Sequence, residues 1–331
     1  MKRRLKLWVV IFIVLLLSVM PLIFTASKGS EGAGEKEPSD LVIPVIYLDV
    51  SINFAQPIKA GVEQAAEDFG VEAIFDGPVN WNLDQQVAII ENYITRQVDG
   101  LAVAPLSSEV IDPLIKKAID AGIPVVTFNT DSPSSERIAF FGQDLVTVAR
   151  EQGEMIADYI NEEGVVLITS CDAAAPWSQM RERGVREGLA KYPKIKVITN
   201  ICNAKGDEQT TYAAIENAML ANPSITAVAS LDAVTTPAVG RYLLRNGQAG
   251  KIIQVGHDLM PETLDNIKAG ATTATLSQNP YAQGYEPVKA LYMHLTEGTP
   301  LEDLNTGKVV VDESNVEEYI KRLEQGDKTV G

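Results

Sequence analysis

Polar and aromatic side chains follow the short apolar runs of this 331-residue chain. The apolar run at 252–256, for example, is followed by His257 and Asp258. A carboxylate at the end of a buried strand requires a partner, which either the next helix N-terminus or a ligand hydroxyl group supplies. The candidate ligand-binding residues near such strand ends are Asn53, Phe54, Trp81, Asn129, Asp131, Trp177, Arg181, Asp232, Asp258 and Gln278.

The candidate residues share a chemistry that suits a sugar or another polyol. Carboxylates and amides accept or share hydrogen bonds with hydroxyl groups, and the Arg181 guanidinium donates several. Trp81 and Trp177 fall in predicted strand-to-helix loops, where a flat ring can cover the C–H face of a sugar. Arg181 falls at a predicted helix start, where a cation is unfavourable to the helix dipole, and this position favours a functional role.

Structural roles remain open for several of these residues. Asp232 and Asp258 could each cap the helix that follows, and Asn53 could hold a turn. Asn129 and Asp131 could hold the turn in the stretch NTDSPSS. Either tryptophan could instead belong to the hydrophobic core.

Apolar runs alternate with amphipathic stretches along most of the chain, and this pattern predicts βαβ units with parallel sheets. The runs lack strict polar alternation, which is typical of sheets covered by helices on both faces. The pattern restarts after residue 143, so we expect an α/β fold with two Rossmann-like lobes. Ligands of open parallel sheets bind outside the carboxyl ends of the strands. The predicted strands are 43–50, 71–75, 100–104, 123–128, 137–142, 164–170, 195–201, 226–230, 251–256 and 273–277, with a further short strand near Val309.

The N-terminus is basic and then apolar, with no charged residue at positions 7–24. This pattern predicts a signal peptide or an N-terminal membrane anchor at 1–27. Residues 28–40 are rich in Gly, Ser and charged residues, and they predict a flexible tether. We therefore expect the rest of the chain in the periplasm or at the outer face of the cytoplasmic membrane, with the N-terminal segment as its only membrane contact.

The formal net charge of the chain is −16 at pH 7. Such a surface repels phosphate backbones, which argues against a nucleic acid as partner. The sequence has no Gly-rich phosphate loop, no G-x-S-x-G elbow and no metal-ligand spacing of the usual kinds. We therefore expect a monomeric binding protein with no catalytic residue, no cofactor and no metal.

Four stretches carry a resemblance to a known family: NFAQPIKAGVEQAAEDFG, VDGLAVAPLSSEVIDPLIKKAIDAGIPVVTFNTDSP, MRERGVREGL and VGHDLMPETLDNIKAGATTATLSQNPYAQGYEPVKAL. In their order and spacing, the chain resembles the type I periplasmic sugar-binding proteins, the ribose- and galactose-type solute-binding proteins of ABC importers. The resemblance implies ligand contacts for Phe54, Asn129, Arg181, Asp258 and Gln278. Ribose itself is not implied, because the chain departs from the ribose pattern at Ala55, Thr130 and His257.

The resemblance also implies how the chain is organised and used. The N-terminal lobe would comprise residues 41–143 plus 279–307, and the C-terminal lobe 144–278 plus 308–331. The two lobes would close on a monosaccharide in a hinged cleft between them, and the protein would deliver it to an ABC permease. A membrane-tethered sugar sensor that reports to a histidine kinase or a chemotaxis-type partner is the alternative.

Cys171 and Cys202 each follow the last apolar residues of strands that are predicted to be neighbours. Adjacent strands lie about 4.8 Å apart, which is within reach of a disulfide. Extracytoplasmic compartments are oxidising. We therefore expect a disulfide between these residues, and two small buried thiols are the alternative.

Overall fold

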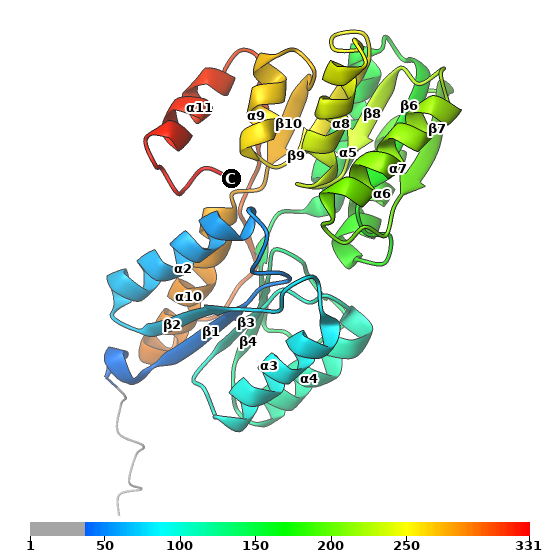
Figure 1. Ribbon diagram of the computed structural model, residues 1–331. Helices are drawn as coiled ribbons and strands as arrows, with labels where there is room; N and C mark the ends of the chain where they lie inside the picture. Colours follow the sequence, from blue (N-terminus) through cyan, green and yellow to red (C-terminus); the bar gives the residue numbers. More distant parts are fainter. Residues whose placement is uncertain (1–36) are drawn as a thin grey trace, which may run out of the picture. The chain divides into compact units, whose positions relative to one another are not determined.

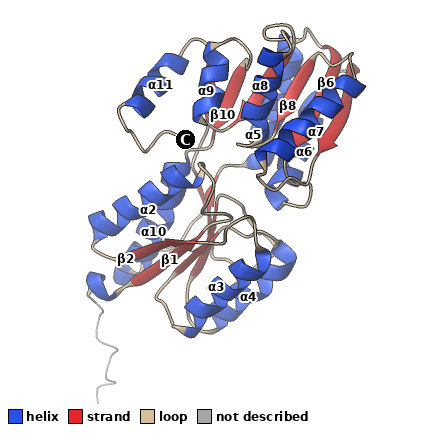
Figure 2. Cartoon of the chain, viewed as in Figure 1, coloured by secondary structure: helices blue, strands red, loops and turns tan. Residues whose placement is uncertain are grey.

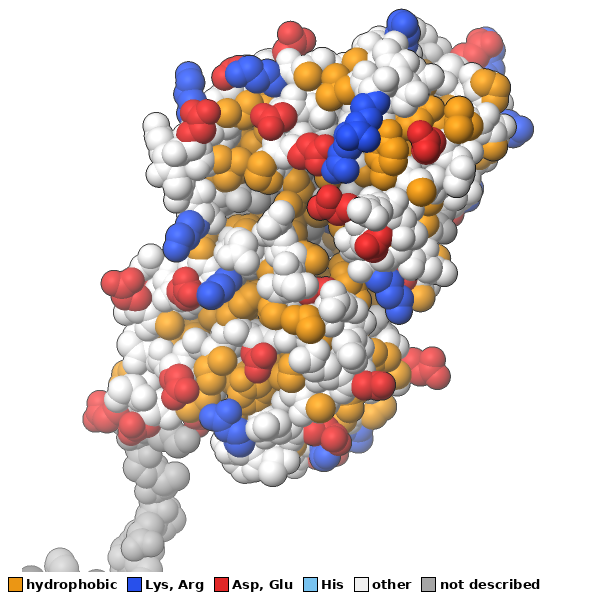
Figure 3. Space-filling view, in the orientation of Figure 1, with side chains coloured by type: hydrophobic (Ala, Val, Ile, Leu, Met, Phe, Trp, Pro, Cys, Tyr) orange, Lys and Arg blue, Asp and Glu red, His pale blue; other side chains and the backbone are white. Residues whose placement is uncertain are grey.

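A computed structural model describes residues 37–331. The signal peptide or anchor predicted at 1–27, and most of the tether predicted at 28–40, lie outside the described residues. None of the helices in the described part of the chain is both long and apolar enough to cross a membrane. Acidic and basic side chains are intermixed over the face shown in Figure 3, and that face has no single large basic patch.

The first sheet has six parallel strands in the order β11-β5-β4-β3-β1-β2 (Figure 1). A short 3-10 helix, η1 (Pro38–Asp40), precedes its first strand. The strands are β1 (Val42–Ile46), β2 (Glu72–Asp76), β3 (Leu101–Val103), β4 (Val125–Phe128), β5 (Ala139–Gly142) and β11 (Leu304–Asn305). The helices that pack on it are α2 (Ala55–Phe69), α3 (Leu83–Thr95), α4 (Ser108–Asp120) and α10 (Pro280–Glu297).

Helices cover both faces of this sheet (Figure 2). Successive side chains of a strand point to opposite faces, and the neighbours Val45 and Ile46 of β1 are both fully buried. Val45 belongs to a hydrophobic cluster with Ile58 of α2 and Leu291 of α10. Ile46 belongs to a second cluster with Ile90 of α3 and residues of α4. This burial on both faces explains why the strands are apolar without alternation.

The second sheet also has six strands, in the order β12-β10-β9-β8-β6-β7. All of its pairings are parallel except that of β12 with β10. The strands are β6 (Glu163–Ser170), β7 (Lys194–Ile201), β8 (Ala227–Ser230), β9 (Ile253–His257), β10 (Ala274–Ser277) and β12 (Val309–Asp312). The associated helices are α5 (Leu145–Tyr159), α6 (Pro176–Leu189), α7 (Glu208–Ala221), α8 (Thr235–Arg245), α9 (Pro261–Lys268) and α11 (Val316–Glu324).

Local sequence signals fix where several of these helices begin and end. The side chains of Asn82, Asp144, Asp207 and Asn279 each accept a hydrogen bond from the backbone N–H of the third residue that follows, as N-caps do. Helix α2 ends at Phe69 and is capped by Gly70, whose φ of 65° is in the left-handed region that glycine adopts without strain.

The chain passes between the two sheets after β5, after β10 and between β11 and β12. The predicted α/β fold with two mostly parallel sheets is therefore confirmed. Most predicted strands are found, with changed ends. The main difference is the first strand, which was predicted over 43–50 but ends at Ile46, so that residues 47–50 belong to a loop at the carboxyl end of the sheet.

Candidate functional site

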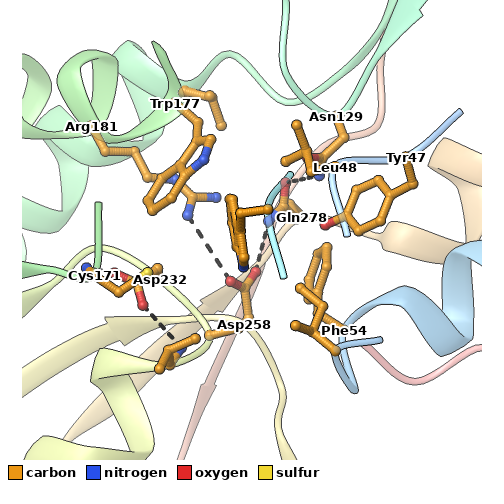
Figure 4. Close-up of a pocket in the computed structure, with 15 residues that line it drawn as sticks. Tyr47, Leu48, Phe54, Asn129, Cys171, Trp177, Arg181, Asp232, Asp258 and Gln278 are labelled. Carbon is orange, nitrogen blue, oxygen red and sulfur yellow. Dashed lines mark hydrogen bonds and ion pairs between the residues drawn. The ribbon is translucent and has the colours of Figure 1, made fainter. Parts of the chain in front are cut away.

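A small cavity lies at the carboxyl ends of strands from both sheets (Figure 4). Its volume is about 40 Å³. Most of the side chains around it are buried. It is lined by Tyr47, Leu48, Ile52, Phe54, Trp81, Asn129, Leu145, Cys171, Trp177, Arg181, Asp232, Ala233, Val234, Asp258 and Gln278.

The cavity brings together eight of the ten candidate residues, which come from seven segments of the chain. These are Phe54, Trp81, Asn129, Trp177, Arg181, Asp232, Asp258 and Gln278. Trp177 was predicted in a loop but lies in the first turn of α6, and Arg181 lies one turn further along the same helix. Pro176 starts α6 earlier than the sequence pattern indicated, because proline is favoured in the first helical turn.

Asp131, a predicted ligand-binding residue, lies outside the cavity. Its carboxylate accepts two hydrogen bonds from the Arg137 guanidinium, at 2.6 and 2.7 Å. The Thr127 hydroxyl donates to it at 2.7 Å and the Ser132 backbone N–H at 2.8 Å. These bonds hold the turn after β4, which is the structural alternative for this residue.

Asn53 also lies outside this cavity. Its backbone carbonyl accepts a hydrogen bond from the Gln56 N–H at 3.1 Å, in the turn that leads into α2. The residue lines a second, larger hollow of about 720 Å³. Its neighbour Phe54, at the N-cap position of α2, is the one that enters the cavity.

Asp258 follows β9 in the left-handed region, at φ 72°, and only 2% of its surface is exposed. Its Oδ1 accepts a hydrogen bond from Gln278 Nε2 at 2.8 Å. Its Oδ2 lies 4.0 Å from Arg181 Nη1, and Figure 4 shows the two groups facing one another. Burial raises the pKa of Asp258, and the Arg181 charge opposes this shift. The carboxylate is therefore held with spare hydrogen-bond capacity in a site shielded from water.

Arg181 is 3% exposed and supplies the buried cation of the site. Its Nη1 donates to the Leu231 carbonyl oxygen at 2.6 Å. Its Nε has no hydrogen-bond partner among residues 37–331. Burial lowers the pKa of Arg181, while Asp258 and Asp232 oppose the shift. An unpartnered donor on a buried cation is expensive unless a ligand supplies the acceptor.

A chain of amides connects this acid to the first sheet. Asn129, with φ 58° after β4, donates through Nδ2 to Gln278 Oε1 at 3.2 Å and to Gln283 Oε1 at 2.8 Å. Gln278 in turn donates to Asp258. Gln283, on α10, was missed because its position inside a helix gives no sign of a strand end.

Asp232 lines the cavity but already has four hydrogen bonds. Its Oδ1 accepts from the backbone N–H groups of Val234 and Thr235, at 2.9 and 2.8 Å. Its Oδ2 accepts from the Cys171 N–H and the Thr235 hydroxyl, both at 3.0 Å. These are the bonds of a residue that caps the start of a helix and ties down a neighbouring loop.

Aromatic rings form two sides of the cavity. Trp177 enters from α6, and its indole Nε1 has no hydrogen-bond partner within the described part of the chain. Its ring centroid lies 6.2 Å from that of Trp81. On the other side, Tyr47 and Phe54 have centroids 6.4 Å apart (Figure 4). Flat rings on both sides suit a flat ligand whose edges carry polar groups.

The sequence patterns missed Tyr47 and several apolar residues of the wall. Tyr47 and Leu48 were assigned to the first strand, but β1 ends one residue earlier and both line the cavity. Burial raises the pKa of Tyr47, so its phenol stays neutral and can donate a hydrogen bond. Ile52, Leu145, Ala233 and Val234 also line the wall, and apolar residues in loops or at a helix start give no specific signal.

The predicted disulfide is not formed in the structure, where Cys171 and Cys202 are both free. The Cys202 N–H donates to the Ser170 carbonyl oxygen at 3.0 Å, and its Sγ lies 3.5 Å from the same oxygen. The Cys202 thiol therefore contacts the neighbouring backbone instead of bonding to Cys171. Cys171 is buried in the cavity wall, and burial raises its pKa.

His257, beside Asp258, lies in the core of the second sheet. Its Nε2 is 3.1 Å from Gln152 Oε1, and burial holds its pKa well below the usual value. It does not line the cavity. Among the described residues, no group of His, Cys, Asp and Glu is arranged to hold a metal ion.

Comparison with known proteins places this geometry in a family. The model of the periplasmic binding protein domain matches residues 43–300. The xylose/arabinose-binding protein of Sulfolobus acidocaldarius is 26% identical over 325 residues, which cover 89% of this chain and 80% of that protein. The D-allose-binding periplasmic protein of Escherichia coli is 27% identical over 256 residues, 75% of this chain and 82% of that protein.

Comparison with solved structures leads to the same family. An ABC transporter solute-binding protein from Burkholderia graminis, in complex with D-arabinose, has a TM-score of 0.81 and 28% identity, and the match covers 85% of this chain and 98% of that one. The proteins matched here are binding proteins and not enzymes, as predicted for this chain. The predicted resemblance to the type I periplasmic sugar-binding proteins is confirmed, and the chain belongs to the periplasmic binding protein domain family.

Proposed function

We propose that this protein is an extracytoplasmic receptor that binds a monosaccharide or a related polyol in the cavity and delivers it to an ABC importer. The observation that carries the proposal is the buried pair of Asp258 and Arg181, 4.0 Å apart between aromatic rings. Both residues are buried, and both keep unused hydrogen-bond capacity. A hydroxyl group of a polyol can donate a hydrogen bond to a carboxylate and accept one from a guanidinium, so one polyol can satisfy both groups.

Each part of the proposed ligand has a partner in the cavity. Hydroxyl groups would donate to Asp258 Oδ2 and accept from Arg181 Nε and from the Trp177 indole N–H, which are unpartnered in the described chain. The apolar faces of the ring would lie against Phe54, Tyr47 and the indoles. Asn129 and Gln278 would contact the edge of the ligand and hold the acid in place. Asp232 would act through the backbone it caps.

We propose that two lobes close around the ligand. They comprise residues 41–143 with 279–307, and residues 144–278 with 308–331. In support, the strands of each proposed lobe belong to one sheet. Ligand contacts from both sheets would make the closed state more stable than the open one, as in a hinge closure.

Two kinds of partner are compatible with this receptor. The importer is favoured by relatives that are named as ABC transporter binding proteins, such as the Burkholderia graminis protein. The alternative is a membrane-tethered sugar sensor that acts on a histidine kinase. The uncharged stretch at 7–24 and the polar stretch at 28–40 favour it, because an uncleaved anchor with a tether would keep the receptor at the membrane.

Thermal unfolding with a panel of ligands tests the proposed function. The panel contains D-xylose, D-arabinose, D-ribose, D-allose, an inositol and several amino acids. A ligand that binds the folded state raises its stability by RT ln(1 + [L]/Kd), about 2.7 kcal/mol at a 100-fold excess over Kd. We expect a rise with at least one sugar or polyol. A rise with an amino acid alone, or with no compound, would contradict the proposal.

A further inference from the structure

We propose that four apolar residues seal the cavity against a larger neighbouring hollow and so limit the ligand to a free monosaccharide or a polyol of similar size. The inference rests on the proposed function, because it concerns the ligand of the same cavity. It goes further by naming the residues that determine how long this ligand can be. These are chiefly Ile52 and Val234, with Phe54 and Ala233 beside them.

The larger hollow, which we call the outer cleft, has a volume of about 720 Å³ and lies beside the cavity. Four residues of the described chain line both spaces: Ile52, Phe54, Ala233 and Val234. A residue that lines two neighbouring spaces lies between them, so these four residues, which we call the apolar seal, form the partition. A ligand that occupies the cavity therefore ends at the apolar seal.

Each sheet contributes one half of the apolar seal. Ile52 and Phe54 lie between β1 and α2, and Ala233 and Val234 lie between β8 and α8. Phe54 is 5% exposed and belongs to a hydrophobic cluster against which the other three residues pack. The two halves belong to different proposed lobes, so the seal would be complete only when the lobes are closed on the ligand. The open state would leave the cavity free for entry.

Two buried carboxylates hold the halves of the apolar seal in place. In the first half, Asp49 is 1% exposed; its Oδ1 accepts from the Ser51 N–H at 2.8 Å and its Oδ2 from the Trp81 N–H at 3.1 Å. In the second half, Asp232 is 5% exposed, and its Oδ1 accepts from the Val234 N–H at 2.9 Å. Moving either loop aside would break hydrogen bonds to a buried acid, which is costly. The seal is therefore fixed within each half.

The chemistry of the apolar seal decides which ligands the closed cavity accepts. Ile52, Ala233 and Val234 have no side-chain donor or acceptor for a hydroxyl group or a glycosidic oxygen. A substituent on the ligand oxygen that faces the seal would have to lie between side chains of the two halves and would disturb their packing. The lobes would then close incompletely, and part of the contact with Asp258 and Arg181 would be lost. The seal therefore selects against glycosides and oligosaccharides.

Ile52→Ala and Val234→Ala test the apolar seal, with Leu48→Ala as the matched control. Each of the first two changes would join the cavity to the outer cleft. Leu48 lines the cavity and not the outer cleft, and Leu48→Ala removes as many atoms as Ile52→Ala, so it enlarges the cavity without joining the two spaces. The probes are the panel sugar that stabilises the parent and its mono-O-methyl derivatives, one for each hydroxyl group, including both methyl glycosides. Calorimetric titration measures each affinity.

We expect the parent to bind the derivative whose methyl group faces the seal about 100-fold more weakly than the free sugar. The readout is the ratio of the two affinities, derivative to free sugar, because this ratio cancels any general weakening of the closed state. Both seal variants should raise the ratio about tenfold for one derivative, the same in both, since the two side chains belong to one partition. Leu48→Ala should leave the ratio for that derivative unchanged.

Two results would overturn the apolar seal while the proposed function stands, because the parent still binds the free sugar in both. One is that neither seal variant raises the ratio for any derivative. The other is that Leu48→Ala raises it as much for the same derivative. A parent that binds no sugar or polyol would remove the proposed function and the seal together. Ile52 and Val234 are changed separately, so a variant that does not fold leaves the other to carry the test.

Discussion

Asp232 and Asp258 stand at the carboxyl ends of the neighbouring strands β8 and β9, and both line the same cavity. They differ in their partners. Asp232 accepts four hydrogen bonds from its own loop and from Cys171. The Asp258 carboxylate accepts one hydrogen bond, from Gln278, and lies 4.0 Å from Arg181. The first acid is satisfied by the fold, whereas the second still has capacity for a ligand.

This difference teaches that residue type and position at a strand end do not decide function. What distinguishes the two acids is the number of hydrogen bonds that each carboxylate still lacks, because a buried carboxylate without hydrogen-bond donors around it is costly. By this criterion we propose that Asp232 is mainly structural and that Asp258 mainly binds the ligand.

Asp258→Asn should weaken binding of the preferred sugar about 100-fold, because hydrogen bonds to a charged acceptor are lost while the shape of the side chain is kept. The free energy of unfolding without sugar should change little, since burial already disfavours the charged form of Asp258. Calorimetric titration and urea unfolding of the same preparation measure the two quantities. Unchanged affinity would mean that Asp258 does not contact the ligand.

Asp232→Ala should lower the free energy of unfolding more than it weakens sugar binding. It leaves the N–H groups of Cys171, Val234 and Thr235 and one hydroxyl without their acceptor. We expect the free energy of unfolding to fall by about 2–3 kcal/mol, measured by urea unfolding. Affinity should fall less than in Asp258→Asn. A stable variant that has lost sugar binding would reverse the roles of the two acids.

Acid should weaken sugar binding through Asp258. Burial raises the pKa of this group above its ordinary value of 3.8, so it is protonated at a higher pH than an exposed aspartate. As pH falls through the raised pKa, the carboxylate loses acceptor capacity, and we expect about a tenfold loss of affinity. The free energy of unfolding without sugar depends on pH in the opposite direction. A group whose pKa is raised in the folded state contributes stability at low pH, and this contribution is lost as pH rises through the raised pKa. Titrations across the acid range should show a step that is missing in Asp258→Asn.

Asp207→Ala should have the smallest effect on the free energy of unfolding, and it measures what an exposed helix cap alone contributes. Asp207 caps α7 through the Thr210 N–H at 2.7 Å, and the residue is exposed. Removing it should reduce the free energy of unfolding by less than Asp232→Ala does, because water replaces the lost acceptor. Urea unfolding measures the difference. If the two losses are equal, burial adds nothing to the role of Asp232.

The fold and most of the cavity could be predicted from sequence because strand ends of parallel sheets meet at one edge. The patterns around Asp258 and Arg181 place them there without any knowledge of their neighbours. The hydrogen-bond partners of the site residues could not be predicted, because they come from distant parts of the chain. Gln283, for example, accepts a hydrogen bond from Asn129, which lies 154 positions earlier. For the same reason the sequence predicts a ligand contact for Asp131, since nothing in the local sequence shows that Arg137 folds back onto it.

The most direct test of the account is calorimetric titration of the parent, Asp258→Asn and Asp232→Asn with D-xylose, D-arabinose, D-ribose and D-allose. We predict that the parent binds at least one of these sugars, that Asp258→Asn loses most of this affinity, and that Asp232→Asn retains most of it. Binding of the same sugar with equal affinity by the parent and Asp258→Asn would contradict the central claim that this buried acid holds the ligand.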